Sequence, residues 1–379
     1  MKIVIAPDSF KESLDAMAVA TAIENGFSQV FPQAEYVKVP LADGGEGTVE
    51  VLMQGLKGEK QYSNVENALG ESVEAMWALL DNGKTALIEV AAASGIDLIA
   101  PETRRVLEAS TFGTGLVIRE ALDKGVEKII IGLGGSATND GGAGILKALG
   151  GKLLDNEGNT IANGGAALNE LASIEFSELH PRCKDVEFVI ACDVDNPLCG
   201  NNGASAIFGP QKGASEQDVE LLDKALANLA SKGEALTGIN SINTPGFGAA
   251  GGTPMGLSLA FNVQIKPGIE MVLDTLCFDE ILENATLVIT GEGQMDNQTL
   301  QGKTPYGVAK RAQAKGIPVV GIAGSLGKEV DGLYHALESV FGTVRSPQPL
   351  AQVLEEAEFN LTRSARNIAN TIKLGMTLA

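Results

Sequence analysis

The first 39 residues alternate between short apolar segments and a helical segment, an order that few folds accommodate. Residues 3–7 have the length and apolar content of a buried strand, and residues 36–39 form a second such segment. Between them, apolar side chains recur at helical spacing from Phe10 to Val30, and Pro32 ends this segment. Strand, helix and strand in this order predict a parallel sheet with helices packed on it.

The start of the first helix is predicted from a pair of polar residues. Ser9 and Glu12 have the spacing of a capping box, with serine at the helix start and glutamate three residues later. We therefore expect the helix to begin at Ser9. Asp8 and Ser9 then either cap this helix or bind a ligand, and the sequence leaves both interpretations open.

The same alternation of strand and helix segments returns near the C-terminus and suggests two domains. It predicts strands at 285–290 and 317–323, an edge strand at 339–341, and helices at 305–315 and from about 350 to 372. We expect residues 1–65 and 281–379 to form one discontinuous Rossmann-like (flavodoxin-like) domain with a parallel sheet. Residues 66–280 are too long for a loop and are expected to form a second, inserted α/β domain. The active site is expected in the cleft between the two domains.

The inserted segment carries its own periodic pattern. Strands are predicted at 76–80, 85–90, 128–133 and 186–192, and helices at 114–122 and 216–232.

Charge and composition exclude several classes of function. The formal net charge is −20, which argues against nucleic acid or an anionic membrane as partner. His180 and His335 are the only histidines, so a histidine-rich metal site is excluded. The four cysteines lack paired metal-ligand spacing and indicate reduced thiols. With no apolar run long enough for a signal peptide or a membrane span, the expected location is the cytoplasm.

Acids, glycines and small hydroxyls follow six of the predicted strands. In open parallel sheets, ligands bind outside the carboxyl ends of the strands, so these clusters are candidate sites. They are Asp8–Lys11, Asp43–Gly47, Gly134–Gly142, Asp193–Pro197, Gly291–Asp296 and Gly324–Ser325.

Each cluster also has a plain structural interpretation. Asp43-Gly44-Gly45 could be a turn, and the Gly134–Gly142 run could be a close helix–sheet packing turn. The alternative for that run is a phosphate cradle built from N–H groups and hydroxyls at a helix start. Lys11 and Arg104 could be surface charges, whereas Asp193 directly follows a strongly apolar strand.

Two common nucleotide-binding patterns are absent. Gly302-Lys303-Thr304 resembles the end of a P-loop, but Asn297 stands where that pattern requires glycine. The first strand is followed by Pro7-Asp8-Ser9-Phe10 in place of a dinucleotide-binding fingerprint. An oxidoreductase is therefore disfavoured.

Several long motifs, taken together, resemble the bacterial glycerate kinases of the first type, often called glycerate 2-kinases. The resemblance covers essentially the whole chain. It implies a Rossmann-like domain interrupted by a second α/β domain, with glycerate and ATP bound between them. It also implies that D-glycerate and ATP give 2-phosphoglycerate and ADP, with Mg²⁺. The motifs are Ala6–Ser13, Ala42–Thr48, Gly132–Gly142, Cys192–Leu198, Phe208–Gly213, Gly291–Gly293, Gln298-Thr299 and Gly302-Lys303.

The chain departs from this pattern at two positions. Gln294 stands where relatives commonly have arginine, and Phe112 where they have tyrosine. Neither change removes an acid or a glycine from the clusters, but a positive charge near position 294 is put in doubt.

Phosphoryl transfer depends mainly on positioning and charge stabilisation, which guides the assignment of roles. We expect Asp193 to be the base, with Asp43 second, and Lys11 to be a catalytic cation. The expected substrate-binding residues are Asp8, Ser9, Gly44, Gly45, Glu46 and Arg104. The expected ATP-binding residues are Gly134, Gly135, Ser136, Ala137, Thr138, Asn139, Asp140 and Lys303. Glu292 and Asp296 are the expected Mg²⁺ ligands.

Other functions stay open at this point. The chain could be a kinase for another small hydroxy acid or sugar acid, or a non-catalytic ligand-binding or sensor protein. A binding protein would have no need for so many carboxylates facing an anionic ligand. The sequence also leaves open a 3-phosphoglycerate product and the choice between monomer and homodimer.

Overall fold

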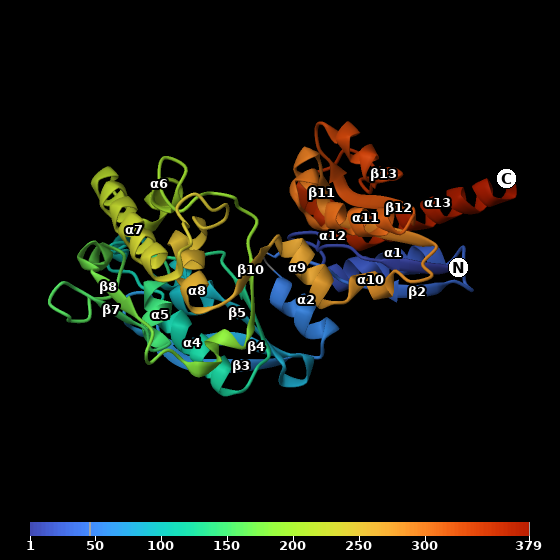
Figure 1. Cartoon of the computed structure of the whole chain (residues 1–379). Coiled ribbons are helices and arrows are strands. Elements are labelled where there is room, and N and C mark those ends of the chain that lie inside the picture. The colour runs from blue at the N-terminus through green and yellow to red at the C-terminus, as the bar shows by residue number, and fades with distance from the viewer. Residues whose placement is uncertain (45–46, 379) are drawn as a thin grey trace. The chain divides into compact units, whose positions relative to one another are not determined.

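The computed structural model describes residues 1–44 and 47–378, and the chain divides into two compact units (Figure 1). The first unit is Met1–Gly55 with Pro267–Ala379, and the second is Leu56–Lys266. These boundaries differ from the expected 65/66 and 280/281. Residues 59–66 form a strand that pairs within the second sheet. The helix Gly268–Thr275 packs in the first unit, where a Cβ on Gly307 would meet Ile269 at 2.5 Å.

The first unit contains a parallel sheet of five strands. Their order is β13-β12-β11-β1-β2, so β1 lies between β2 and β11. Ile3 of β1 is in register with Tyr36 on one side and Leu287 on the other. Numbered along this unit alone, the order is 2-1-3-4-5, and its direction reverses between β1 and β11. The strands are β1 (Lys2–Ile5), β2 (Glu35–Lys38), β11 (Leu287–Met295), β12 (Val319–Leu326) and β13 (Ser339–Gly342).

Helices cover this sheet, and the N- and C-terminal ones pack together. Ile23 and Phe27 of α1 are fully buried in one cluster with Leu361 of α13. A Cβ on Gly26 would lie 2.5 Å from the carbonyl oxygen of Thr362, so this contact requires glycine. The helices are α1 (Ala16–Ser28), α2 (Thr48–Gly55), α9 (Gly268–Thr275), α10 (Phe278–Ile281), α11 (Thr304–Ala314), α12 (Leu350–Glu355) and α13 (Ala357–Leu378).

The expected start of the first helix is wrong. The helix begins at Ala16, where the Asp15 side chain accepts a hydrogen bond from the Ala18 N–H at 2.7 Å. The Ser9 hydroxyl donates to Asp8 and caps no helix. Phe10 is buried and forms an isolated bridge with Leu14. The Ser9–Glu12 spacing matches a capping box by coincidence, because this segment turns back on itself before the helix starts.

The second unit contains a mixed sheet in the order β10-β9-β6-β5-β4-β3. β10, β9, β6 and β5 are parallel neighbours, while β4 and β3 are antiparallel. Trp77 is buried in its core and donates from Nε1 to Ser63 Oγ at 2.9 Å. The strands are β3 (Glu59–Glu66), β4 (Ser72–Leu80), β5 (Thr85–Glu89), β6 (Lys128–Gly132), β9 (Glu187–Ala191) and β10 (Val263–Lys266), and β7 (Lys152–Leu154) pairs separately with β8 (Ser173–Glu175).

The helices of the second unit range from one turn to six. The longest begins with a capping box at Ser215 and Asp218, which each bond the other's backbone. They are α3 (Val90–Ser94), α4 (Phe112–Asp123), α5 (Ala143–Ala148), α6 (Ala204–Phe208), α7 (Glu216–Thr237) and α8 (Thr253–Ala260).

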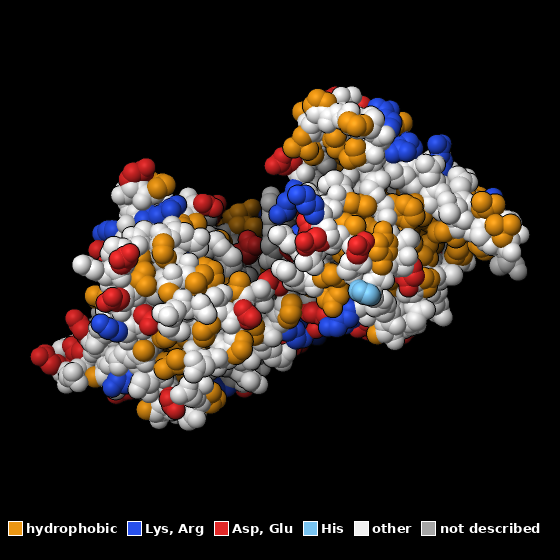
Figure 2. All heavy atoms as spheres, turned by 90° about the horizontal axis from the view of Figure 1, so that it is seen from above, with side chains coloured by type: hydrophobic (Ala, Val, Ile, Leu, Met, Phe, Trp, Pro, Cys, Tyr) orange, Lys and Arg blue, Asp and Glu red, His pale blue; other side chains and the backbone are white. Residues whose placement is uncertain are grey.

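The surface carries charges of both signs. On the face drawn in Figure 2, acidic side chains are scattered among basic ones, and no single basic patch dominates. Within the described part of the chain, every helix is too short or too polar to cross a membrane.

Candidate functional site

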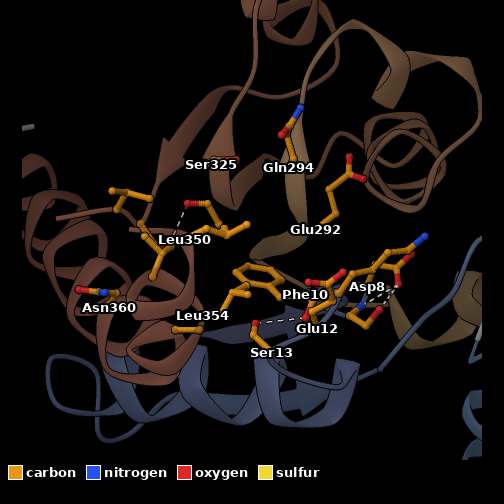
Figure 3. Close-up of a pocket in the computed structure, with 18 of the residues that line it drawn as sticks. Asp8, Phe10, Glu12, Ser13, Glu292, Gln294, Ser325, Leu350, Leu354 and Asn360 are labelled. Atoms are coloured by element: carbon orange, nitrogen blue, oxygen red, sulfur yellow. Dashed lines mark hydrogen bonds between the residues drawn. The ribbon is translucent and has the colours of Figure 1, made fainter. Parts of the chain in front are cut away.

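A cavity of about 670 Å³ opens in the first unit, at the carboxyl ends of β1, β11, β12 and β13 (Figure 3). It contains the point between β1 and β11 where the strand order reverses, the usual ligand site of such sheets. One end is charged and the other is apolar, and Figure 3 draws Phe10 between Asp8 and Leu354. The charged end consists of Asp8, Lys11, Asp43, Glu292 and Lys303.

Asp8 is held by the backbone and by one hydroxyl. Its N–H donates to the Gly291 carbonyl at 2.8 Å, which ties β1 to β11. Thr304 Oγ1 donates to Asp8 Oδ2 at 2.6 Å, and the Ser9 N–H donates to Oδ1 at 2.6 Å. Burial raises the pKa of Asp8, the Thr304 hydrogen bond opposes that rise, and the negative charge of Asp43 adds to it.

Glu292 lies in β11 on the other side of the reversal point. Thr299 Oγ1 donates to its Oε1 at 2.6 Å, and Lys303 Nζ is 3.5 Å from its Oε2. Burial raises the pKa of Glu292; the Thr299 bond and the Lys303 charge lower it, and the charge of Asp8 raises it again. The fold therefore places acidic groups close enough to repel one another, an arrangement that a bound cation would stabilise.

The donor chemistry of this end fits Mg²⁺. Mg²⁺ prefers carboxylate oxygens and is usually held by one or two carboxylates together with substrate phosphates. Asp8 and Glu292 supply two such groups. In the part of the chain that the structure describes, no group of three or more His, Cys, Asp or Glu side chains is placed to hold a metal ion.

Asp296, the other expected metal ligand, has a different environment. Its carboxylate accepts from Gln294 Nε2 at 2.9 Å and from the Gln298 N–H at 2.9 Å. The Gln298 bond caps the short helix Asn297–Gln301, and both bonds lower the pKa of Asp296, the Gln294 bond most. Asp296 is not among the residues that line the cavity. The structure thus brings Glu292, but not Asp296, to the charged end.

Two other expected residues of the first unit lie at the same cavity. Ser9 and Lys11 line it, and Lys11 is exposed. Gly44 has a φ of 97°, which glycine adopts without strain. Gly45 and Glu46 lie outside the described residues.

The expected phosphate loop lies in the second unit, after β6, and most of it is buried. Asp140 is fully buried and accepts from the Thr111 N–H at 2.8 Å, the Thr111 hydroxyl at 3.0 Å and the Gly144 N–H at 3.1 Å. Burial raises its pKa, and these hydrogen bonds oppose the rise. Asp140 therefore organises the loop from within, since its side chain is committed to neighbouring backbone groups.

The remaining loop residues divide into buried and exposed ones. The Ala137 N–H donates to the Ser94 carbonyl at 2.9 Å, and Asn139 Nδ2 donates to Ser205 at 2.9 Å. Thr138 is fully buried. Gly134 and Gly135 are exposed, so they are the loop residues that can present backbone groups to a ligand.

Lys212 is a notable residue that the sequence reasoning missed as a candidate. Its side chain is 3% exposed, and Nζ donates to Ser136 Oγ at 2.9 Å and to the Thr138 carbonyl at 2.6 Å. Burial lowers its pKa to about 7, although the charge of Asp140 works in the opposite direction. The sequence signal was the position of this lysine inside the Phe208–Gly213 motif. The motif alone does not show that the lysine contacts the loop after β6.

We expect Lys212→Met to change how stability depends on pH. Above pH 7 the folded chain releases the Lys212 proton, whereas the unfolded chain keeps it up to the ordinary pKa of 10.5. The unfolded state then binds more protons, so this group makes the parent more stable as pH rises through that window. Relative to the variant, the parent should gain free energy of unfolding on the order of 1–3 kcal/mol between pH 6.5 and 9.5. Urea titrations at both pH values measure this.

Lys224→Met is the matched control, because Lys224 is an exposed lysine of the same unit. It should leave the pH dependence of the parent unchanged. A difference between parent and Lys212→Met that stays constant with pH would show that Lys212 does not titrate in this range.

Two more expected residues belong to the second unit. Asp193 is exposed two residues after the end of β9, and Gly134 lies two residues after the end of the neighbouring parallel strand β6, so both lie at the same edge of the sheet. Arg104 is half-buried and donates from Nη1 to the Gln211 carbonyl at 3.0 Å. That bond holds Arg104 against the segment that carries Lys212.

Comparison with known proteins shows similarity over the whole chain. Residues 3–373 match the model of the glycerate kinase family. The chain is 49% identical to a glycerate kinase of Bacillus subtilis, covering 100% of this chain and 99% of the relative. It is 49% identical to a glycerate 2-kinase of Escherichia coli, covering 99% of each. A crystal structure from Salmonella typhimurium, of a protein described as glycerate kinase 2, superposes with a TM-score of 0.89 at 48% identity, covering 100% of this chain and 99% of that one.

Proposed function

The chain belongs to the glycerate kinase family, and from this premise we propose that it transfers the γ-phosphoryl group of ATP to D-glycerate, giving 2-phosphoglycerate and ADP. The observation that carries the proposal is the cluster of Asp8, Glu292 and Lys303 where the strand order of the first unit reverses. The name of the Escherichia coli relative, glycerate 2-kinase, supports the 2-phosphate as product.

We assign the charged end of the cavity to the phosphate chain and its metal. Asp8 and Glu292 would hold Mg²⁺, which when bound neutralises negative charge on the phosphate oxygens. Lys303, positioned 3.5 Å from Glu292, and the exposed Lys11 supply positive charge for the same oxygens. Thr304 and Thr299 each hold one carboxylate in place by a 2.6 Å hydrogen bond.

We assign acceptor chemistry to residues of the second unit. Asp193 would accept the proton of the attacking hydroxyl, and Arg104 would bind the carboxylate of glycerate. Asp43 is the second candidate for the base. In the Gly134–Asp140 loop, we assign contacts with the ATP phosphates to the backbone of Gly134 and Gly135 alone, because the neighbouring side chains are buried.

Two broader proposals follow from the same features. The 2-1-3-4-5 order of parallel strands supports a Rossmann-like description of the first unit. A reaction that consumes ATP supports a cytoplasmic location. A kinase for another small hydroxy acid is the alternative, because the charged end would serve any phosphoryl acceptor.

The test is an ADP-release assay with D-glycerate, glycolate, lactate, tartronate and simple sugars as acceptors. We expect D-glycerate to give the highest kcat/KM. Phosphorus NMR of the product distinguishes a phosphate on the secondary carbon from one on the primary carbon by its coupling to one or two protons. Release of ADP no faster with D-glycerate than with buffer alone would refute the proposal.

A further inference from the structure

We propose that the apolar end of the cavity binds the adenine base of ATP, and that Asn360 recognises the amino group of that base. The apolar end is formed by Phe10, Val344, Leu350, Val353 and Leu354. This inference rests on the proposed kinase function and adds to it the place and the selectivity of nucleotide binding.

The apolar end leaves large apolar side chains exposed to water. Leu350 is 67% exposed and Val344 is 42% exposed, and both line the cavity. Exposed apolar surface inside a pocket is typical of a site that a ligand covers. A planar purine supplies the apolar faces for such contacts.

The two ends of the cavity match the two ends of a nucleotide. Figure 3 draws Leu350 and Leu354 on one side of Phe10, and Asp8 and Glu292 on the other. ATP joins an apolar base to a charged, metal-binding phosphate chain. A volume of about 670 Å³ lies in the usual range for pockets that hold molecules of this size. Glycerate is small and carries a carboxylate, so it has no group that the apolar end would favour.

Asn360 gives this end a polar group that lacks a protein partner. The residue is 2% exposed and lines the cavity from α13. Among the described residues, nothing bonds to its Oδ1, while Nδ2 lies 3.5 Å from Glu356 Oε2, at the limit of a hydrogen bond. An unpaired buried acceptor is costly, so a position like this calls for a partner.

Adenine would supply that partner. Oδ1 itself is buried, so it meets the base only when the carboxamide turns about Cβ–Cγ, and this turn breaks the long contact between Nδ2 and Glu356. The 6-amino group of adenine then donates to it. Hypoxanthine carries a carbonyl oxygen at that position, which can only accept from Nδ2 and leaves Oδ1 unpaired, so we expect ADP to bind more tightly than IDP.

The experiment measures binding by calorimetry, using ADP, IDP and inorganic tripolyphosphate as probes. Leu354→Asn should weaken ADP at least 10-fold and leave tripolyphosphate within about twofold of the parent, because the phosphate end is intact. Leu374→Asn, an exposed leucine of α13 that does not line the cavity, is the control and should bind all probes as the parent does.

A second variant tests the role of Asn360. Asn360→Leu should bring the ratio of the IDP and ADP dissociation constants close to one, whereas Asn370→Leu, at an exposed position of the same helix, should keep the parental ratio. Equal ADP affinity in Leu354→Asn and the parent would overturn the proposed base site. An unchanged ratio in a folded Asn360→Leu protein would overturn the role of Asn360.

The same proteins separate this inference from the kinase proposal. A parent that binds neither ADP nor tripolyphosphate and releases no ADP with any acceptor would overturn both. If the parent turns over D-glycerate and Leu354→Asn keeps the parental KM for ATP, only the inference about the base fails. If ADP binds as expected but no acceptor is phosphorylated, only the proposed reaction fails.

Discussion

Asp193→Asn is expected to lower kcat by about 10²–10⁴-fold, the usual cost of removing a general base. Asparagine keeps the size of the side chain but cannot accept the proton of the attacking hydroxyl. The KM values for ATP and D-glycerate should stay within a few-fold of the parent. Asp193 is exposed after β9, so we expect little change in the melting temperature. Steady-state kinetics and thermal melting together test this prediction.

Asp195→Asn is the matched control, because Asp195 is an exposed aspartate in the same segment. It should retain most of the parental kcat. If folded Asp193→Asn turns over near the parental rate, the base lies elsewhere, and Asp43→Asn is the next variant to measure.

Glu292→Gln is expected to raise the Mg²⁺ concentration needed for half-maximal activity by at least about 10-fold, since it removes one of two proposed carboxylate ligands. The amide preserves the volume and can still accept from Thr299. At fixed, subsaturating Mg²⁺, kcat/KM for ATP should fall by about 10²-fold. Measuring the rate against Mg²⁺ concentration separates lost metal affinity from lost turnover.

The activity of the parental enzyme should depend on pH in a way that reflects the same carboxylates. The pKa values of Asp8 and Glu292 are both raised. Protons therefore compete with the cation at a higher pH than for ordinary carboxylates, and added Mg²⁺ should restore part of the rate lost on the acid side.

Asp296→Asn is the control for Glu292→Gln, because the Asp296 carboxylate caps a short helix. If Asp296→Asn raises the Mg²⁺ concentration for half-maximal activity as much as Glu292→Gln does, Asp296 is a ligand after all.

Much of the fold follows from apolar periodicity. The segment predicted at 339–341 as an edge strand is β13 at the edge of the first sheet, and the helix predicted at 216–232 is α7, which extends to Thr237. β3 escaped prediction because its sequence, EKQYSNVE, is almost entirely polar, and pairing with β4 decides its conformation. The start of α1 was misplaced because local spacing cannot show that residues 8–14 form a turn.

The candidate site was only partly predictable, for a similar reason. The rule that ligands lie at strand ends drew attention to Asp8, Asp43 and Glu292, which line one cavity, because the rule depends on strand order alone. Burial of Ser136 and Thr138 under Lys212 depends on a contact across 76 residues of sequence, which spacing does not reveal. The unpaired oxygen of Asn360 depends in the same way on how α13 packs.

The pairing of β1 with β11 has a consequence for synthesis of the chain on the ribosome. Ile3 pairs with Leu287, which is synthesised much later, so the N-terminal strand has no neighbour on that side until most of the polypeptide has been made. Residues 56–266, by contrast, emerge as one continuous stretch and contain both sides of every strand pair in their own sheet. The order of translation therefore lets the second unit form while the first still exposes apolar segments, among them residues 2–5 and the buried face of α1.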